Sequence, residues 1–442
     1  MPPVSIQHAL GLHLHQPAGN LRSLLRDDEA EVGRILRCYE RIAHHAHKYA
    51  HVARLHVALS VALLEQMRDP NLIEACRHLA DLPAILDDLR SAASIEFVGT
   101  GYCHAPLPLI PSQDWDEQLQ NERVTVEAVL GRVLKGYWPP ASLFTVDVIP
   151  ALVRAGYEYV LLPSSLLVTP DGVVVDPYRV HAMSHQGARI TVVPLDPGFS
   201  HAQEAGLEAP WFADEVRNGV AHSPPTNAPY LLTTWSDAEN GEWFRRLDEE
   251  HGFFGQFFSP YMEFCETGEF PVQPVHLAAY LRANRPAAEV ELRPHTPAEA
   301  VAASPHGDEK RVARERLFQS SARYWSRAKA ATQQTDTRNA LPRARELILQ
   351  AEDSGFLLGD ADRRAMMLGL LDQADRLLDP KPAPAVQPSV TPAAPAGPLA
   401  PSRDATGPAV VKPQGAAAGK PKAPVGRKPK RSARKTPPKR RS

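Results

Sequence analysis

The sequence predicts an α/β fold with parallel strands, followed by a helical segment and a basic tail. Short runs rich in Val, Ile and Leu alternate with helical periodicity across residues 1–300. Strand-like runs then stop, and residues 301–380 carry helical patterns alone. From 381 to 442 the composition shifts to Pro, Ala, Lys and Arg. These changes predict an α/β domain over 1–300, a helical domain over 301–380 and a tail over 381–442.

Seven apolar runs are the strand candidates of the first domain. Parallel strands need long crossover connections, usually helices, so the helical stretches between the runs favour parallel pairing. Seven strands can close into a barrel or spread as an open sheet, and periodicity does not distinguish the two. The candidates are Val4–Leu14, Leu55–Val61, Ile95–Val98, Gly136–Trp138, Tyr157–Leu162, Ile190–Leu195 and Tyr230–Trp235.

Helical periodicity is clearest in three stretches between the strand candidates. Apolar residues recur at three- and four-residue steps over Asn71–Ala93 and Asp114–Leu134, and Val148–Ala155 is short and apolar. After residue 308, similar patterns suit two to four packed helices. The tripeptide Asp353-Ser354-Gly355 predicts a break between two of these helices.

The net charge of −2 conceals a strong asymmetry between the tail and the rest of the chain. Residues 381–442 contain 14 Lys and Arg and one acidic residue, whereas residues 1–380 contain 35 Lys and Arg and 50 Asp and Glu. The tail has too few apolar residues to offset the entropy of ordering, so we expect it to be disordered. Its charge suits binding to nucleic acid, polyphosphate or an acidic protein, or a loose solubilising contact with its own acidic body.

The remaining composition indicates a protein of a reducing compartment. The four cysteines are widely spaced and include no Cys-x-x-Cys pair, which argues against a zinc knuckle or a disulfide framework. No apolar run reaches about 18 residues, the length that a membrane span requires. We therefore expect a cytoplasmic protein with no membrane segment and no cofactor.

Two histidines lie side by side at the end of the first strand candidate. In a strand, residues two apart point the same way, so His13 and His15 project from one face just before Pro17 ends the strand. The carboxyl ends of strands are where α/β folds place ligand sites. Two polar residues at a strand exit with no further role are the alternative.

Polar and aromatic residues also follow the other strand candidates. Because the carboxyl ends of parallel strands meet at one edge, these side chains are expected to gather there. Aromatic faces pack on sugar rings and acidic groups bind sugar hydroxyls, so this combination is typical of carbohydrate recognition. The residues are Glu96, His104, Trp138, Asp196, Asp237 and Glu239.

Four segments, in order along the chain, make it resemble glycoside hydrolase family 57, an α-glucan-active family with a (β/α)7 barrel and a helical domain. They are residues 12–17 (LHLHQP), 96–111 (EFVGTGYCHAPLPLIP), 136–141 (GYWPPA) and 234–243 (TWSDAENGEW). The resemblance covers residues 1–375. It implies a (β/α)7-type barrel over 1–300 and a ligand among the α-1,4-glucans, such as glycogen, starch or maltooligosaccharides.

The resemblance also implies roles for individual residues. Family members are retaining enzymes, in which a carboxylate nucleophile and an acid/base carboxyl lie about 5–5.5 Å apart. Asp196 matches the acid/base position, although Leu195 precedes it where the family usually has Arg. Ala141 stands at the position of the nucleophilic Glu, in Trp138-Pro139-Pro140-Ala141, and a methyl group cannot form a glycosyl-enzyme.

Seven further residues match family positions around the sugar or lie beside them. Glu96 has an alternative role as a buried partner that orients a histidine. Asp237 and Glu239 have an alternative role as helix-capping acids. The substrate-binding candidates are His13, His15, Glu96, His104, Trp138, Asp237 and Glu239.

Three functions are compatible with these patterns. The first is an active glycosidase or glucanotransferase with a displaced nucleophile. The second is a non-catalytic glucan-binding relative, which Ala141 favours slightly. The third is a metal-dependent hydrolase that uses His13, His15 and His104, which the barrel-end His-x-His permits but the family resemblance disfavours.

Overall fold

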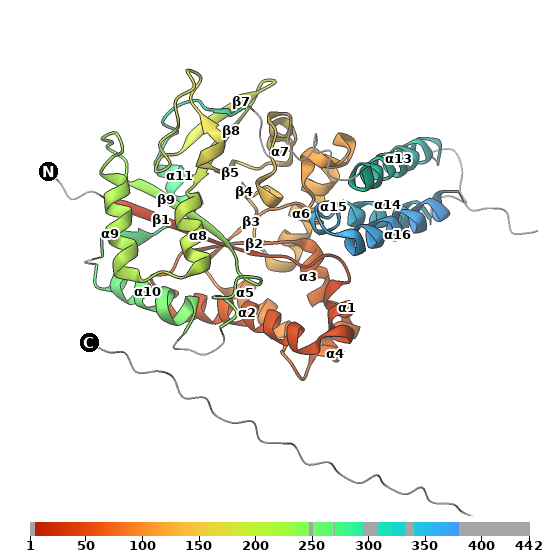
Figure 1. Cartoon of the computed structure of the whole chain (residues 1–442), viewed down its shortest axis with the longest axis horizontal. Coiled ribbons are helices and arrows are strands. Elements are labelled where there is room, and N and C mark those ends of the chain that lie inside the picture. The colour runs from red at the N-terminus through yellow and green to blue at the C-terminus, as the bar shows by residue number, and fades with distance from the viewer. Residues whose placement is uncertain (1–4, 247–250, 269, 295–307, 332–339, 380–442) are drawn as a thin grey trace, which may run out of the picture. The chain divides into compact units, whose positions relative to one another are not determined.

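A computed structural model describes residues 5–246, 251–268, 270–294, 308–331 and 340–379 of the chain (Figure 1). All of these residues belong to one compact unit. The predicted tail over 381–442 and the predicted domain boundary at residue 300 lie outside the described residues.

Seven parallel strands form the (β/α)7 barrel of this unit, in the spatial order β1-β2-β3-β4-β5-β8-β9 and back to β1. The order follows the chain, as expected when each strand is joined to the next by a right-handed crossover. The strands are β1 (Ile6–Leu14), β2 (Leu55–Leu59), β3 (Ile95–Val98), β4 (Gly136–Tyr137), β5 (Tyr159–Pro163), β8 (Ala188–Leu195) and β9 (Tyr230–Asp237).

Two short sets of hydrogen bonds close the barrel where regular strand pairing is interrupted. Between β3 and β4, the Gly99 amide donates to the Gly136 carbonyl at 2.9 Å, and the Trp138 amide donates to the Gly99 carbonyl at 2.8 Å. Between β8 and β9, the Asp196 amide donates to the Thr233 carbonyl at 2.9 Å. The closed arrangement, which strand periodicity alone left open, is therefore the one that forms.

α-Helices cover the barrel and connect successive strands, except that β5 and β8 are joined by a segment with a short 3₁₀ turn and no α-helix (Figure 1). The stretch Asn71–Ala93 forms two helices because Asp81 accepts a hydrogen bond from the Ala84 amide and begins a new one. The helix predicted over Asp114–Leu134 ends early, since Gly131 adopts φ +64° and ends it. The connecting helices are α1 (Asn20–Asp27), α2 (Glu29–Lys48), α3 (Val61–Met67), α4 (Pro70–Cys76), α5 (Leu82–Ser91), α6 (Trp115–Leu130), α7 (Ile149–Ala155), α8 (Pro197–Ala205) and α9 (Ala209–Val220).

Further elements, which strand and helix patterns did not predict, extend the barrel. The short strand β10 (Val272–Pro274) pairs with the start of β1, and α11 (Leu277–Ala283) follows it. An antiparallel strand, β7 (His181–His185), pairs with β8. The others are β6 (Leu167–Val168), β11 (Glu291–Leu292), a π-helix (Phe253–Phe258) and α10 (Ser259–Glu266).

Side-chain alternation in β1 separates an outer core from the barrel interior. Leu10, Leu12 and Leu14 belong to the large apolar cluster that includes the surrounding helices. Ala9 belongs to a second cluster, with inward-facing residues of β2, β3, β5, β8 and β9, which fills the barrel. His13 shares the parity of Ala9, so it points into the barrel at its carboxyl-terminal end.

Helices α13 (Asp308–Ala331), α14 (Ala340–Ala351), α15 (Ser354–Leu357) and α16 (Ala361–Leu378) pack together beside the barrel (Figure 1). The predicted break at 353–355 is present between α14 and α15. A buried ion pair joins this group to the barrel: Arg345 Nη2 lies 2.7 Å from Asp114 Oδ1. None of the described helices is long and apolar enough to cross a membrane. All four cysteines are buried free thiols.

Candidate functional site

Three imidazole rings stack at the carboxyl-terminal end of the barrel. The ring centroids of His13 and His104 are 4.5 Å apart, those of His104 and His15 are 4.1 Å apart, and those of His13 and His15 are 5.9 Å apart. The interplanar angles of the three pairs lie between 21° and 30°. His13 and His15 come from the end of β1, whereas His104 comes from the loop after β3.

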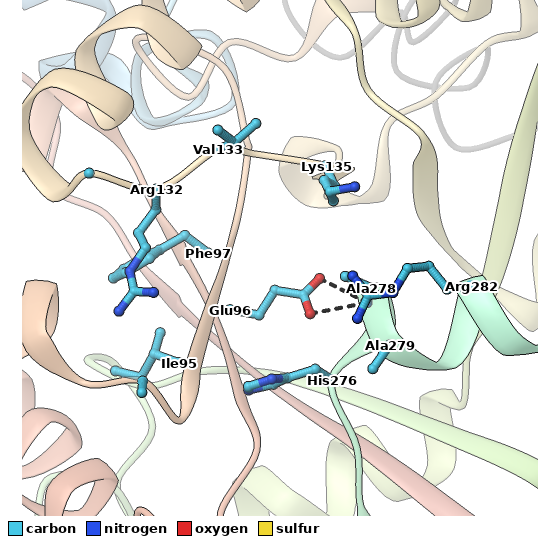
Figure 2. A pocket seen from close by; sticks show the side chains of 12 residues that line it. Ile95, Glu96, Phe97, Arg132, Val133, Lys135, His276, Ala278, Ala279 and Arg282 are labelled. Carbon is cyan, nitrogen blue, oxygen red and sulfur yellow. Dashed lines mark hydrogen bonds between the residues drawn. The ribbon is translucent and has the colours of Figure 1, made fainter.

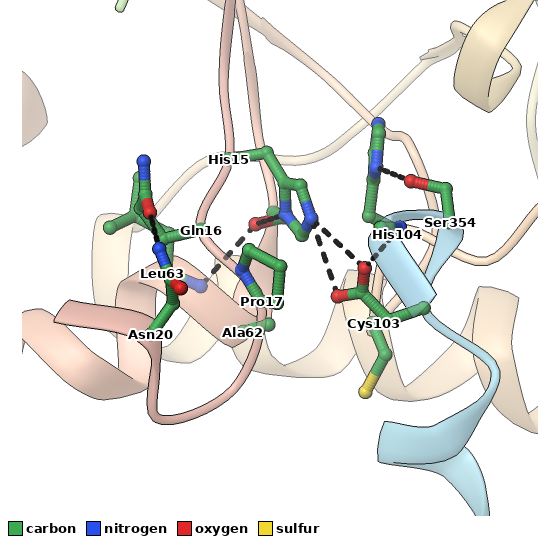
Figure 3. Close-up of polar contacts among 12 residues, drawn as sticks. His15, Gln16, Pro17, Asn20, Ala62, Leu63, Cys103, His104 and Ser354 are labelled. Carbon is green, nitrogen blue, oxygen red and sulfur yellow. Dashed lines mark hydrogen bonds and ion pairs between the residues drawn. The ribbon is translucent and has the colours of Figure 1, made fainter. Parts of the chain in front are cut away.

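Both ring nitrogens of His15 have protein partners (Figure 3). Its Nδ1 lies 2.8 Å from Ser60 Oγ, at the start of α3, and its Nε2 lies 3.3 Å from Asp353 Oδ1. The backbone amide of His15 donates to Glu239 Oε1 at 3.2 Å. Segments that follow β2 and β9 and one from the C-terminal helices thus hold this histidine in place.

His104 is held by Ser354 (Figure 3). Its Nδ1 lies 2.7 Å from Ser354 Oγ, and its carbonyl accepts the Ser354 amide at 3.2 Å. His104 has φ +55°, a left-handed conformation that is costly for a residue with a Cβ. Such conformations cluster at functional sites, where the surrounding contacts maintain them.

Two of the three histidines present unpartnered nitrogen atoms. His13 is 7% exposed and His104 is 4% exposed, yet the Nε2 atom of each has no hydrogen-bond partner among the described residues. Burial lowers the pKa of His13 to about 3, with the nearby Asp237 opposing the shift and His15 adding to it. Burial, with the neighbouring His15 and His13, also lowers the pKa of His104 well below its usual value. Both rings are therefore neutral at pH 7.

Tryptophans extend the stack of histidines. The ring of Trp138 lies 4.7 Å from that of His13, and Trp235 stacks on Trp138 at 5.9 Å. The Nε1 atom of Trp235 and the hydroxyl of Thr100 are also buried without partners in the described part of the chain. Unpaired buried polar atoms are rare in folded proteins, so their grouping at one end of a barrel indicates a ligand site.

Asp237 supplies a carboxylate beside the histidines. It is the register partner of His13 in the pairing of β9 with β1. Its Oδ1 accepts the amides of Glu239 and Asn240, both at 3.1 Å, which is the capping role considered for this residue. The Asp237 amide donates to Glu204 Oε1 on α8 at 3.3 Å, and burial raises the pKa of Glu204. Two carboxyl groups thus lie close together at this end of β9.

Glu239 is buried behind the histidines instead of facing a ligand. It is 1% exposed, and its carboxyl group accepts hydrogen bonds from the His15 amide and the Tyr39 hydroxyl. Burial, together with the charge of Asp237, raises the pKa of Glu239 well above its usual value. Its contacts therefore support the backbone of the His15 segment.

Comparison with known proteins supports the family resemblance. The sequence model of Glycosyl hydrolase family 57 matches residues 9–201, which carry His13, His15, His104 and Trp138. Residues 9–201 thus match the family that the sequence motifs resemble. A curated relative, alpha-amylase 1 of Dictyoglomus thermophilum, is 23% identical over 295 residues, covering 65% of this chain and 39% of the relative.

Solved structures share the fold. The 4-alpha-glucanotransferase of Thermococcus litoralis superposes with a TM-score of 0.65 at 18% identity, covering 86% of this chain and 61% of that one. The family 57 branching enzyme of Pyrococcus horikoshii gives a TM-score of 0.58 at 14% identity, covering 85% and 88% of the two chains. The chain thus spans less than two thirds of the curated amylase and of the glucanotransferase.

Asp196, the residue matched to the acid/base position of family 57, caps the start of a helix. Leu195 points into the barrel, and the next residue, Asp196, begins α8. Asp196 Oδ1 accepts the Phe199 amide at 2.9 Å, and its carbonyl accepts the Ser200 hydroxyl at 2.6 Å. Asp237 lies next to His13 through the pairing of β9 with β1.

Ala141 lies in an exposed turn directly after Trp138. The turn spans Pro140–Ser142, and Ala141 adopts φ +51° within it. The neighbouring Ser142 also has a positive φ, of +57°. A side chain at position 141 therefore projects from a tight left-handed turn at the carboxyl-terminal end of the barrel.

Glu96 lies away from the other predicted residues, toward the amino-terminal ends of the strands (Figure 2). It lines a pocket of about 410 Å³ with residues that precede β3 and β4. Its carboxylate accepts the Ala278 amide and the Tyr159 hydroxyl, and lies 3.9 Å from His56 Nε2. Its contacts fit the alternative considered for Glu96, a partner of a buried histidine, and its role at the sugar stays a prediction.

Sequence patterns missed several residues of the site. Ser60 is the N-cap of α3 and Asp353 is the N-cap of α15, and Ser and Asp are common at such positions. Ser354 and Glu204 lie within helices and show no distinguishing pattern. These residues belong to the site through tertiary contacts with His15, His104 and Asp237, and local sequence patterns do not predict such contacts.

Proposed function

We propose that the protein binds α-1,4-glucans at the carboxyl-terminal end of the barrel, without the covalent chemistry of its family. The observation that carries the proposal is the grouping of two neutral, unpartnered imidazole nitrogens, from His13 and His104, beside the face of Trp138. Neutral imidazoles exchange hydrogen bonds with sugar hydroxyls, and an indole face packs on the apolar face of a pyranose ring.

The glucan as ligand is supported by the family and by its relatives. The curated relative is an alpha-amylase, and solved relatives include a 4-alpha-glucanotransferase and a branching enzyme. All three names refer to α-glucans. Asp237, next to His13, supplies the charged acceptor that commonly fixes the orientation of a sugar.

The absence of covalent chemistry is supported by Ala141. A retaining glycosidase needs a carboxylate nucleophile, and a methyl group at that position cannot attack the anomeric carbon. Loss of a nucleophile costs about 10⁴–10⁶ in rate in enzymes where it has been removed. We therefore expect glucan binding with negligible turnover.

A second candidate, an active glycosidase with a different carboxylate pair, is favoured by one observation. Glu204 Oε1 accepts the backbone amide of Asp237, and the charge of Asp237 helps to raise the pKa of Glu204, so the two carboxyl groups are neighbours. In this case Glu204→Gln and Asp237→Asn would each abolish turnover by the wild-type protein.

The metal-dependent alternative has less support. Metal ligands direct nitrogen lone pairs to a common point, whereas His13, His15 and His104 stack their ring faces. Across the residues that the structure describes, no group of three or more His, Cys, Asp or Glu side chains is arranged to hold a metal ion.

Calorimetric titration with maltoheptaose tests the proposal. Trp138→Ala should weaken binding by about tenfold or more, since an aromatic platform contributes on the order of 1–3 kcal/mol. The matched control is Trp211→Ala, because Trp211 is 48% exposed on α9 and does not contact the histidines. Equal affinities of the wild type and Trp138→Ala would contradict the proposed site.

A further inference from the structure

We propose that Asp353 and Ser354, in the turn between α14 and α15, are positioning residues that set the tautomers of His15 and His104. The identity of the ligand comes from the proposed function, whereas the positioning itself stands on contacts within the protein. Both residues lie outside the part of the chain that the family model matches, residues 9–201. The C-terminal helices would then complete the site that the barrel begins.

The turn is held firmly against the barrel. Gln118 Nε2, on α6, donates to Glu352 Oε2 at 2.7 Å and to the Leu349 carbonyl at 3.3 Å. On the other side, Gly355 packs against Pro17, so closely that a Cβ at position 355 would lie 3.0 Å from Pro17 Cγ. The turn thus contacts both the segment after β1 and the helix after the His104 loop.

The hydrogen bonds of His15 define one tautomer. The Asp353 side chain is 1% exposed, and a carboxylate can only accept, so His15 Nε2 must carry the proton between them. Ser60 Oγ already accepts the Leu63 amide at 3.3 Å, which leaves its hydroxyl proton to donate to His15 Nδ1. The neutral ring is therefore the Nε2–H form, with Nδ1 as acceptor.

His104 is set in a similar way by the adjacent serine. Among the described residues, the acceptor that faces the Ser354 hydroxyl is His104 Nδ1, at 2.7 Å from Ser354 Oγ. Donation from this hydroxyl fixes Nδ1 as acceptor and places the proton of the neutral ring on Nε2. That Nε2–H is the atom left without a partner, so Ser354 makes His104 a hydrogen-bond donor to the ligand.

The barrel and the C-terminal helices would then contribute differently to the site. The barrel supplies the rings of His13, His15 and His104, while the C-terminal helices determine which ring nitrogen carries the proton. Loss of either positioning residue should therefore weaken ligand binding without unfolding the barrel.

Nitrogen NMR of the full chain labelled with ¹⁵N-histidine provides the test, together with maltoheptaose titration. Asp353→Ala removes the carboxylate, whose Oδ1 faces His15 Nε2 at 3.3 Å and accepts the Gly355 amide at 2.7 Å. This variant should change the ¹⁵N shifts of His15 from the pattern of the Nε2–H tautomer. It should also weaken the binding of maltoheptaose about tenfold, the loss expected for one hydrogen bond to a charged group. Ser354→Ala should do the same at His104.

The control is Asp360→Ala, which removes a carboxylate from the exposed N-cap of α16, where Asp360 accepts the Arg363 amide. It should leave both tautomers and the affinity as in the wild type. Unchanged tautomers in Asp353→Ala and Ser354→Ala would overturn the proposal, as would an equal loss of affinity in the control. If the wild type binds no maltoheptaose, the proposed function fails, and the NMR shifts alone still decide the positioning.

Discussion

The Nε2 atom of His15 lies 3.3 Å from the carboxylate of Asp353, a residue 338 positions later in the chain. This contact joins the first strand of the barrel to the C-terminal helices. The candidate site is therefore formed by the barrel together with the C-terminal helices.

Asp196 should matter for stability and not for ligand binding. Asn is as good an N-cap as Asp, so Asp196→Asn should leave the free energy of unfolding within about 0.5 kcal/mol, whereas Asp196→Ala should lower it by about 1 kcal/mol. Urea denaturation and maltoheptaose titration of both variants check this. An unchanged fold with abolished glucan turnover in Asp196→Asn would restore Asp196 as the acid/base residue.

His13 and His104 should stay neutral across the physiological range. Burial lowers the pKa of His13 to about 3 and lowers the pKa of His104 well below 6.5. Ring ¹H NMR signals of both residues should therefore not titrate between pH 8 and about pH 5. A midpoint near 6.5 for either residue would show that its ring is solvated and charged, which would contradict a neutral hydrogen-bonding role.

Glu122 should make the protein less stable as the pH rises. Burial raises the pKa of Glu122 from 4.5 to about 7, although the Thr100 amide and the Tyr157 hydroxyl oppose the shift. Between these two values the folded state holds a proton that the unfolded state has released, so the free energy of unfolding falls as pH increases, by about 3 kcal/mol in total.

Removing the Glu122 carboxyl group should remove this pH dependence. We expect the free energy of unfolding of Glu122→Gln minus that of the wild type to be larger at pH 8 than at pH 4.5. The increase should be on the order of 1–3 kcal/mol, measured by urea denaturation. The exposed Glu127→Gln, on the same helix, serves as the control. A constant difference between Glu122→Gln and the wild type at both pH values would contradict the assignment.

The ion pair of Arg345 with Asp114 should be required for the helices to remain attached. Both side chains are buried, with 7% and 0% exposure, so Arg345→Met removes the cation from the buried Asp114 carboxyl group, which keeps its hydrogen bonds from Trp325 and Ser321. This should cost about 3–5 kcal/mol of unfolding free energy.

A surface arginine on the same helix gives the comparison. Arg343 pairs with Glu346 and its side chain is 56% exposed, so Arg343→Met should change the unfolding free energy by less than about 1 kcal/mol. Equal effects of the two substitutions in urea denaturation would mean that the buried pair does not anchor the helices.

Much of the fold follows from local patterns in the sequence. The alternation of apolar runs with helices predicted the parallel strands, and family resemblance supplied their closure into a barrel. Helix ends were less predictable, because Asp81 and Gly131 interrupt patterns that periodicity alone would extend. The short strands β6, β7, β10 and β11 carry too few residues to show a period.

The site was predictable where strand ends carry it and unpredictable elsewhere. His13, His15, His104, Trp138 and Asp237 meet because the carboxyl ends of parallel strands lie together. Glu96 lies away from them because it comes at the second position of β3 instead of after it. Asp353 and Ser354 could not be found, since their role depends on how distant helices dock on the barrel.

The central claim is that the protein binds glucan without cleaving it. It is tested most directly by titrating the wild-type protein with maltoheptaose and then following the saturated mixture by ¹H NMR of the anomeric protons. The account predicts saturable binding and anomeric signals that match those of maltoheptaose in buffer. New α-anomeric signals from hydrolysis or transfer would contradict it, as would a titration with no saturable binding.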